Sequence, residues 1–168
     1  ILGGGKDRYS DLTMTNKGLM IVVLGDEESD GPIMRSVDGE TWFNITPANF
    51  TPSFGRMVVD ISESNDSIAY LIGNSSDSHI FWKYKFLSGD GSGTGGSWED
   101  RSQFIPNDYS SQSGYDIHVK VSPDNEKMVY FGGTNLYYTT DGLESSGKIY
   151  KFGGYNSKNH HPDQHAVI

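Results

Sequence analysis

The sequence contains no cysteine, and this absence excludes disulfide scaffolds, thiolate zinc sites and cysteine nucleophiles. It also lacks any apolar run long enough to span a bilayer, so membrane insertion is not expected. Basic residues are few: 13 Lys and Arg stand against 22 Asp and Glu, which gives a net charge of -9. Nucleic-acid binding needs a basic face, so a nucleic-acid partner is not expected, and an anionic membrane surface is disfavoured for the same reason.

Helical periodicity is missing as well, since no stretch of eleven or more residues repeats its apolar positions every 3.6 residues. The chain has instead 21 Gly, 10 Tyr, 8 Phe and 3 Trp among its 168 residues. Glycine suits tight turns and aromatic residues suit strands, whereas good helix formers are scarce. The composition therefore predicts an all-β fold.

A short polar turn recurs three times at a near-constant step. Its pattern is Ser or Thr, any residue, Asp and Gly, and the copies start at Ser36, Ser88 and Thr139, 52 and 51 residues apart. Such a step indicates a repeated supersecondary unit. In a turn of this kind the Asp carboxylate accepts backbone N–H bonds from the following residues, and Gly supplies a positive φ. We expect each copy to join the third and fourth strands of a unit.

Apolar segments of strand length surround each turn in the same order. The expected units cover residues 1–48, 49–106 and 107–160, and residues 161–168 begin a fourth. Four short strands in about fifty residues are typical of one blade of a β-propeller. A β-sandwich also has short strands at regular spacing, but it gives no reason for the constant step. We therefore predict about three blades of four antiparallel strands, plus one strand.

The first turn continues through Thr41 to Trp42, and it resembles the Asp-box, or BNR repeat, whose pattern is Ser-x-Asp-x-Gly-x-Thr-Trp. The first copy is one residue shorter than this pattern, and the other two keep only its front half. The residues matched are Ser36, Asp38, Gly39, Thr41, Trp42, Ser88, Asp90, Gly91, Thr139, Asp141 and Gly142. The resemblance implies a propeller of the glycosyl-hydrolase-like or sortilin-like bacterial kind, secreted or at the cell surface. It also implies that the turns are structural and lie away from the functional face.

The candidate functional residues lie where the first strand of each blade would meet the propeller channel. Asp116 and His118 form one pair, Asp163 and His165 form another, and strand alternation would place both members of a pair on one face. One hypothesis makes Asp116 and Asp163 the catalytic carboxyl groups of a glycoside hydrolase. The other is a polar channel with satisfied Asp–His hydrogen bonds. The accompanying binding candidates are His118, His165, His161, Tyr115 and Arg56.

Two further interpretations are weaker. His161, Asp163 and His165 are metal-ligand types, but three ligands on one short strand seldom converge, so we assign no metal and no cofactor. A sialidase needs three arginines around its substrate, and Arg56 alone begins a first strand. We therefore expect an extracellular recognition module for carbohydrate or protein, with the polysaccharide hydrolase as the alternative.

The ends of the sequence, Ile1 and the apolar residues 166–168, suggest an internal piece of a longer protein. A propeller closes with four or more blades, and open sheet edges are an aggregation liability. We expect the remaining blades to come from the same polypeptide or from a partner that completes the ring.

Overall fold

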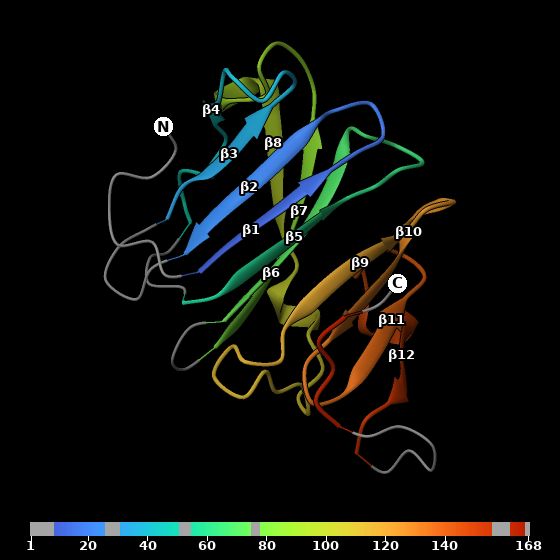
Figure 1. Cartoon of the computed structure of the whole chain (residues 1–168). Helices are drawn as coiled ribbons and strands as arrows, with labels where there is room; N and C mark the ends of the chain where they lie inside the picture. The colour runs from blue at the N-terminus through green and yellow to red at the C-terminus, as the bar shows by residue number, and fades with distance from the viewer. Residues whose placement is uncertain (1–8, 26–30, 51–54, 75–77, 156–161, 167–168) are drawn as a thin grey trace.

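The computed structural model describes residues 9–25, 31–50, 55–74, 78–155 and 162–166. Within these residues the fold is all-β, as predicted: three antiparallel sheets of four strands, each with its strands in chain order, and no α-helix (Figure 1). None of the described helical segments is long or apolar enough to cross a membrane. The three sheets do not by themselves close into a ring over the described ranges.

The first sheet consists of β1 (Tyr9–Met14), β2 (Met20–Gly25), β3 (Ile33–Ser36) and β4 (Phe43–Asn44). The second consists of β5 (Met57–Ile61), β6 (Ile68–Asn74), β7 (His79–Phe86) and β8 (Gly96–Asp100). The third consists of β9 (His118–Ser122), β10 (Asn125–Gly132), β11 (Leu136–Thr139) and β12 (Ile149–Gly153). Three single-turn 3-10 segments lie in the connections: η1 (Gly93–Gly95), η2 (Ser102–Phe104) and η3 (Ser146–Lys148).

The sheets pack face to face, with the second sheet between the other two (Figure 1). Alternate residues of β6 explain this order, because Ala69 and Leu71 contact the core shared with the first sheet, whereas Tyr70 and Ile72 contact the core shared with the third. Successive strand residues point to opposite faces, so a strand covered on both sides has no polar face. In the first sheet, residues 21–25 of β2 are all buried as well.

The first strands of the three sheets, β1, β5 and β9, lie side by side (Figure 1). Carboxylates join them: Asp11 Oδ2 accepts the Val59 N–H at 2.9 Å, and Asp60 Oδ2 accepts the Val121 N–H at 2.7 Å. In a continuous sheet, each of these N–H groups would donate to a carbonyl of the neighbouring strand. Here a carboxylate accepts the bond instead, so the N–H group is still satisfied. Carboxylate side chains therefore help to fix the positions of three sheets that are not themselves hydrogen-bonded edge to edge.

Each repeated turn connects the third strand of its sheet to the fourth, as the sequence predicts. In the first turn Asp38 Oδ1 accepts the N–H groups of Glu40 at 2.9 Å and Thr41 at 2.8 Å, and Ser36 Oγ accepts the Gly39 N–H at 2.9 Å. The bonds from Thr41 and Glu40 lower the pKa of Asp38 to about 2, because they stabilise its ionised form. Gly39 has a φ of 76°, and the Trp42 indole N–H closes the turn on the Gly39 carbonyl at 3.1 Å.

The third turn repeats this chemistry with a longer connection. Thr139 Oγ1 donates to Asp141 Oδ1 at 2.8 Å, which also accepts the Glu144 N–H at 3.1 Å, and Gly142 has a φ of 70°. The second turn differs, since Asp90 Oδ1 instead accepts the N–H and hydroxyl of Ser92, at 2.8 and 2.7 Å. The glycine-rich insertion after Gly91 places that serine beside the carboxylate.

Two local expectations are wrong. The first strand of the third unit begins at His118, so Asp116 precedes the strand and does not alternate with His118 along it. Residues 162–166 have irregular backbone, and Asp163 has a φ of 75°, which is incompatible with the expected strand. This segment instead bonds to the β10–β11 turn: the Asp163 N–H donates to the Thr134 carbonyl at 3.3 Å and the Gln164 N–H to the Gly133 carbonyl at 2.8 Å.

Candidate functional site

A hollow of about 390 Å³ opens where β1, β5 and β9 lie side by side. Its lining carries acidic, basic, hydroxyl and imidazole groups that come from all three sheets and from the C-terminal segment. The polar members are Asp11, Thr13, Arg56, Asp60, His118, Lys120 and His165. Lys120 Nζ and Thr13 Oγ1 both donate to Asp60 Oδ1, at 3.1 and 3.2 Å. Hydrogen bonds between the three sheets therefore join the residues that line the hollow.

The two predicted catalytic carboxyl groups are brought together beside this hollow. Gln112 Nε2 donates to Asp116 Oδ2 at 2.8 Å and to Asp163 Oδ1 at 2.5 Å, so one amide nitrogen bridges the two carboxyl groups. Asp116 is fully buried. Burial raises the pKa of Asp116, the charge of Asp163 raises it further, and His165 opposes the shift.

The histidines pair differently from the sequence prediction. His165 Nε2 lies 3.3 Å from Asp116 Oδ1, so the contact crosses between the two predicted Asp–His units. His118 Nδ1 donates to the Gln164 carbonyl at 3.1 Å, which leaves its Nε2 unprotonated and without a hydrogen-bond partner in the described residues. Burial lowers the pKa of His118, so the neutral form is favoured. A Cβ at Gly132 would overlap His118 Cε1, so only glycine leaves room for the ring in this position.

Tyr115 and Arg56 form the rim near His165. The Arg56 guanidinium donates to the carbonyls of Gly114 at 3.1 Å and Tyr115 at 2.8 Å, and so ties the second sheet to the loop before β9. The Tyr115 ring is 66% exposed and meets the His165 ring edge to face at 5.1 Å. An exposed aromatic ring held beside a polar hollow offers an apolar surface to a ligand.

Of the predicted site residues, the structure thus gathers Asp116, Asp163, His118, His165, Tyr115 and Arg56 in one region. His161 lies outside the described residues. The same described part of the chain contains no group of three or more His, Asp or Glu side chains placed to hold a metal ion.

Sequence reasoning missed Gln112 and Asp60. Gln112 has a φ of 47° in a tight loop, a conformation for which glutamine carries no local signal. Asp60 did carry a signal, because it is the only charged residue in the apolar strand Met57–Ile61. A buried carboxylate in such a strand needs partners, and Lys120 and Val121 of the next sheet supply them.

A larger hollow of about 450 Å³ lies beside η2 and the outer strands β11 and β12. An ion pair between Lys151 Nζ and Asp108 Oδ2, at 3.1 Å, stands among the residues that line it. None of the predicted catalytic or binding residues belongs to it. The smaller hollow at the first strands is therefore the candidate site.

We expect Asp116→Asn to remove part of the pH dependence of stability. Burial raises the folded-state pKa of Asp116 above the unfolded value of about 4. The folded state then binds more protons between these two values, so the free energy of unfolding of the wild type falls as pH rises through that interval. Asparagine does not titrate, so the variant lacks this contribution. The stability difference should therefore move in favour of the variant as pH rises above about 4.

Chemical denaturation at several pH values measures this difference. Asp124→Asn, at an exposed turn position, is the matched control and should show no such movement. A difference between Asp116→Asn and the wild type that stays constant with pH would contradict the assignment.

Comparison of the chain with models of protein families, with curated proteins and with solved structures finds no significant match. The function is therefore inferred from the geometry of the site and from the repeated turns.

Proposed function

We propose that this chain is an arc of an Asp-box β-propeller that binds a glycan at its first strands without cleaving it. Three four-stranded sheets stack in chain order with their first strands adjacent, and this arrangement supports the arc. The hydrogen bonds of Asp38 and Asp141 support the Asp-box resemblance of the first and third turns. An extracellular location rests on the same resemblance and belongs to the proposal.

The observation that carries the binding function is the mixed lining of the 390 Å³ hollow. Sugar hydroxyl groups donate and accept hydrogen bonds at once, so they suit a surface where carboxylates, an ammonium group and imidazoles alternate. Tyr115 adds the exposed ring against which the apolar face of a sugar packs. A hollow of this size holds one or two sugar rings rather than a folded protein surface, which favours a glycan over a protein ligand.

The carboxyl pair favours binding over hydrolysis. Glycoside hydrolases place two carboxyl groups about 5–5.5 Å apart in retaining enzymes and about 6.5–9.5 Å apart in inverting ones, with the scissile bond between them. Here Asp116 and Asp163 accept hydrogen bonds from the same amide nitrogen of Gln112. The Gln112 amide nitrogen stands where the scissile bond would have to lie, and Asp116 is fully buried. We assign the pair a structural role, which fixes the C-terminal segment against the loop before β9.

Titration of the chain with a panel of oligosaccharides, followed by NMR chemical shifts, tests this function. We expect shifts at the first strands and at Tyr115, and at least a tenfold loss of affinity in Tyr115→Ala and Lys120→Met, about 1.4 kcal/mol each. Lys127→Met, at an exposed residue of β10 outside the hollow, is the control and should bind as the wild type does. Absence of binding across the panel would overturn the proposal, and release of reducing sugar would establish the hydrolase instead.

A further inference from the structure

The two contacts between sheets are built in the same way. Each buries an apolar face of one sheet against an apolar face of the next, and in each an arginine of the earlier sheet reaches the repeated turn of the later one. Arg35 Nη1 donates to the Asp90 carbonyl at 3.3 Å, and Arg101 Nη1 donates to the Gly142 carbonyl. The stack is therefore a repeated contact that runs in one direction along the chain.

The third sheet carries a second face of the same apolar kind, which no described sheet covers. Four rings form this aromatic face: Tyr130, Tyr138, Tyr150 and Phe152. The Tyr138 and Tyr150 rings stack at 5.0 Å, and the Phe152 ring lies 5.5 Å from Tyr138 and 6.1 Å from Tyr130. Tyr150 is 43% exposed and Phe152 is 38% exposed. The opposite face of this sheet, with Val129 and Phe131, is completely buried against the second sheet.

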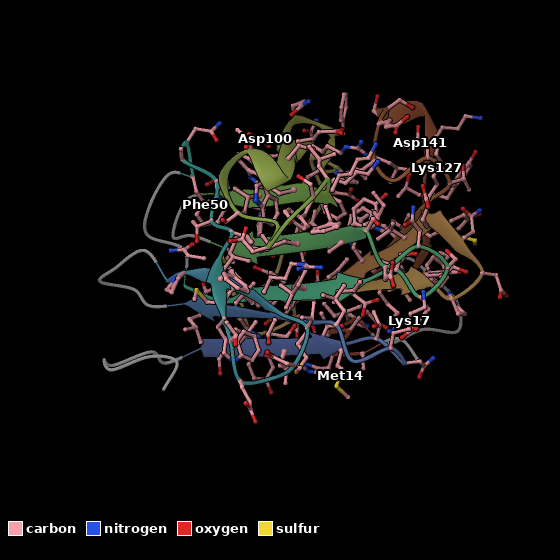
Figure 2. All side chains as sticks on the ribbon, turned by 90° about the horizontal axis from the view of Figure 1, so that it is seen from above. Met14, Lys17, Phe50, Asp100, Lys127 and Asp141 are labelled. Carbon is pink, nitrogen blue, oxygen red and sulfur yellow. The ribbon has the colours of Figure 1, made fainter. Side chains whose placement is uncertain are left out.

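The first sheet carries a matching surface at the other end of the stack. Its aliphatic face consists of Leu12, Met14, Met20, Val22 and Met34. The strand register aligns these residues, since Leu12 pairs with Val22, Val22 with Met34, and Met14 with Met20. Leu12 is 57% exposed and Met14 is 61% exposed, and Figure 2 shows Met14 on the outer side of the first sheet, away from the other two.

We propose that these two faces dock on each other between two copies of this chain. The aromatic face of one copy packs on the aliphatic face of the other, which continues the sheet stack from the third sheet of one chain to the first sheet of its partner. Methionine sulfur makes favourable contacts with aromatic rings, and three of the five aliphatic-face residues are methionines. Each chain therefore carries both faces of the proposed interface, the aromatic face on its third sheet and the aliphatic face on its first.

The number of sheets favours a closed ring of two chains. A contact between unlike faces is head-to-tail, and it forms a ring when the rotation closes and a filament when it does not. Propellers contain about four to eight blades, and two chains of three sheets bring six. Two chains therefore form a closed ring with two identical docking contacts. The partner chain would lie beside the hollow, because Leu12 and Met14 of the aliphatic face also line it.

Sedimentation velocity of the 168-residue chain across a range of concentrations tests the proposal. We expect a dimer that gives way to monomer on dilution. Met14→Glu blocks the aliphatic face, Tyr150→Glu blocks the aromatic face, and both replace exposed side chains, so each variant should fold and sediment as a monomer. Leu87→Glu, at a 52% exposed loop residue outside both faces, should remain dimeric. Circular dichroism of each variant verifies that it is folded.

Mixing the two monomeric variants separates the head-to-tail ring from other dimers. Each variant keeps one intact face, so the mixture should form a 1:1 dimer through a single contact. A contact between two aromatic faces predicts instead that Met14→Glu alone stays dimeric, and that result overturns the proposal. A wild-type chain that is monomeric at high concentration, or that forms open polymers, overturns it as well. The first of these outcomes means that sheets of another polypeptide are needed to cover the faces.

Discussion

Phe131→Ala is expected to lower the free energy of unfolding by about 3–5 kcal/mol, because it leaves a cavity in the core between the second and third sheets. Phe131 lies on β10, is fully buried and is the centre of a cluster of rings. Its ring stacks on Tyr137 at 5.4 Å, meets Phe81 edge to face at 5.6 Å and lies 6.0 Å from Tyr109. Removing the central ring loses all of these contacts at once. The effect is large because side chains, and not a ladder of backbone hydrogen bonds, join the second sheet to the third.

Urea denaturation at a fixed protein concentration measures the loss, since association would otherwise change the apparent stability. Leu87→Ala removes a side chain that is 52% exposed, and it should change stability by no more than about 0.5 kcal/mol. If both variants lose the same small amount, the core between the second and third sheets is not what stabilises the fold.

Arg101→Met is expected to have the second largest effect, a loss of about 2–3 kcal/mol. The Arg101 side chain is only 5% exposed and follows the last strand of the second sheet. It donates to the buried Gly142 carbonyl of the third turn and pairs with Glu99 at 2.5 Å and with Glu144 at 3.4 Å. Methionine has similar volume but leaves the carbonyl unsatisfied, whereas the two half-exposed carboxylates rehydrate at lower cost.

Arg101→Lys separates the charge of Arg101 from the shape of its guanidinium group. Arg101→Lys keeps the charge, but one ammonium group cannot reproduce the planar fork that reaches the carbonyl and the carboxylates together. We expect it to recover less than half of the lost stability. Lys148→Met, an exposed cation of η3 near the same turn, is the control and should lie within about 0.5 kcal/mol of the wild type. Full recovery by lysine would reduce the role of Arg101 to its charge alone.

The sequence located the secondary structure well because the signals involved are local. Strands were recognised from short apolar segments, and the turns from an Asp–Gly pair whose side-chain and backbone bonds lie within a few residues. The turn at Ser36 satisfies its own hydrogen bonds through Asp38 and Trp42, so no distant contact is needed to form it. The start of β9 was missed because the loop before it uses positive φ at Gln112 and Ser113, which neither residue favours.

The sequence alone therefore determined the all-β class, the three four-stranded units and the residues that could carry chemistry, since each depends on neighbours in the chain. Only the tertiary structure decided which of those residues meet. His165 pairs with Asp116 instead of Asp163, because the irregular segment 162–166 bonds to the turn at Gly133 and Thr134. The His165–Asp116 contact and the Gln112–Asp163 bond each join residues about fifty positions apart. No local sequence pattern encodes contacts over that separation. The same holds for Arg101 and Gly142, which meet only because the second and third sheets pack together.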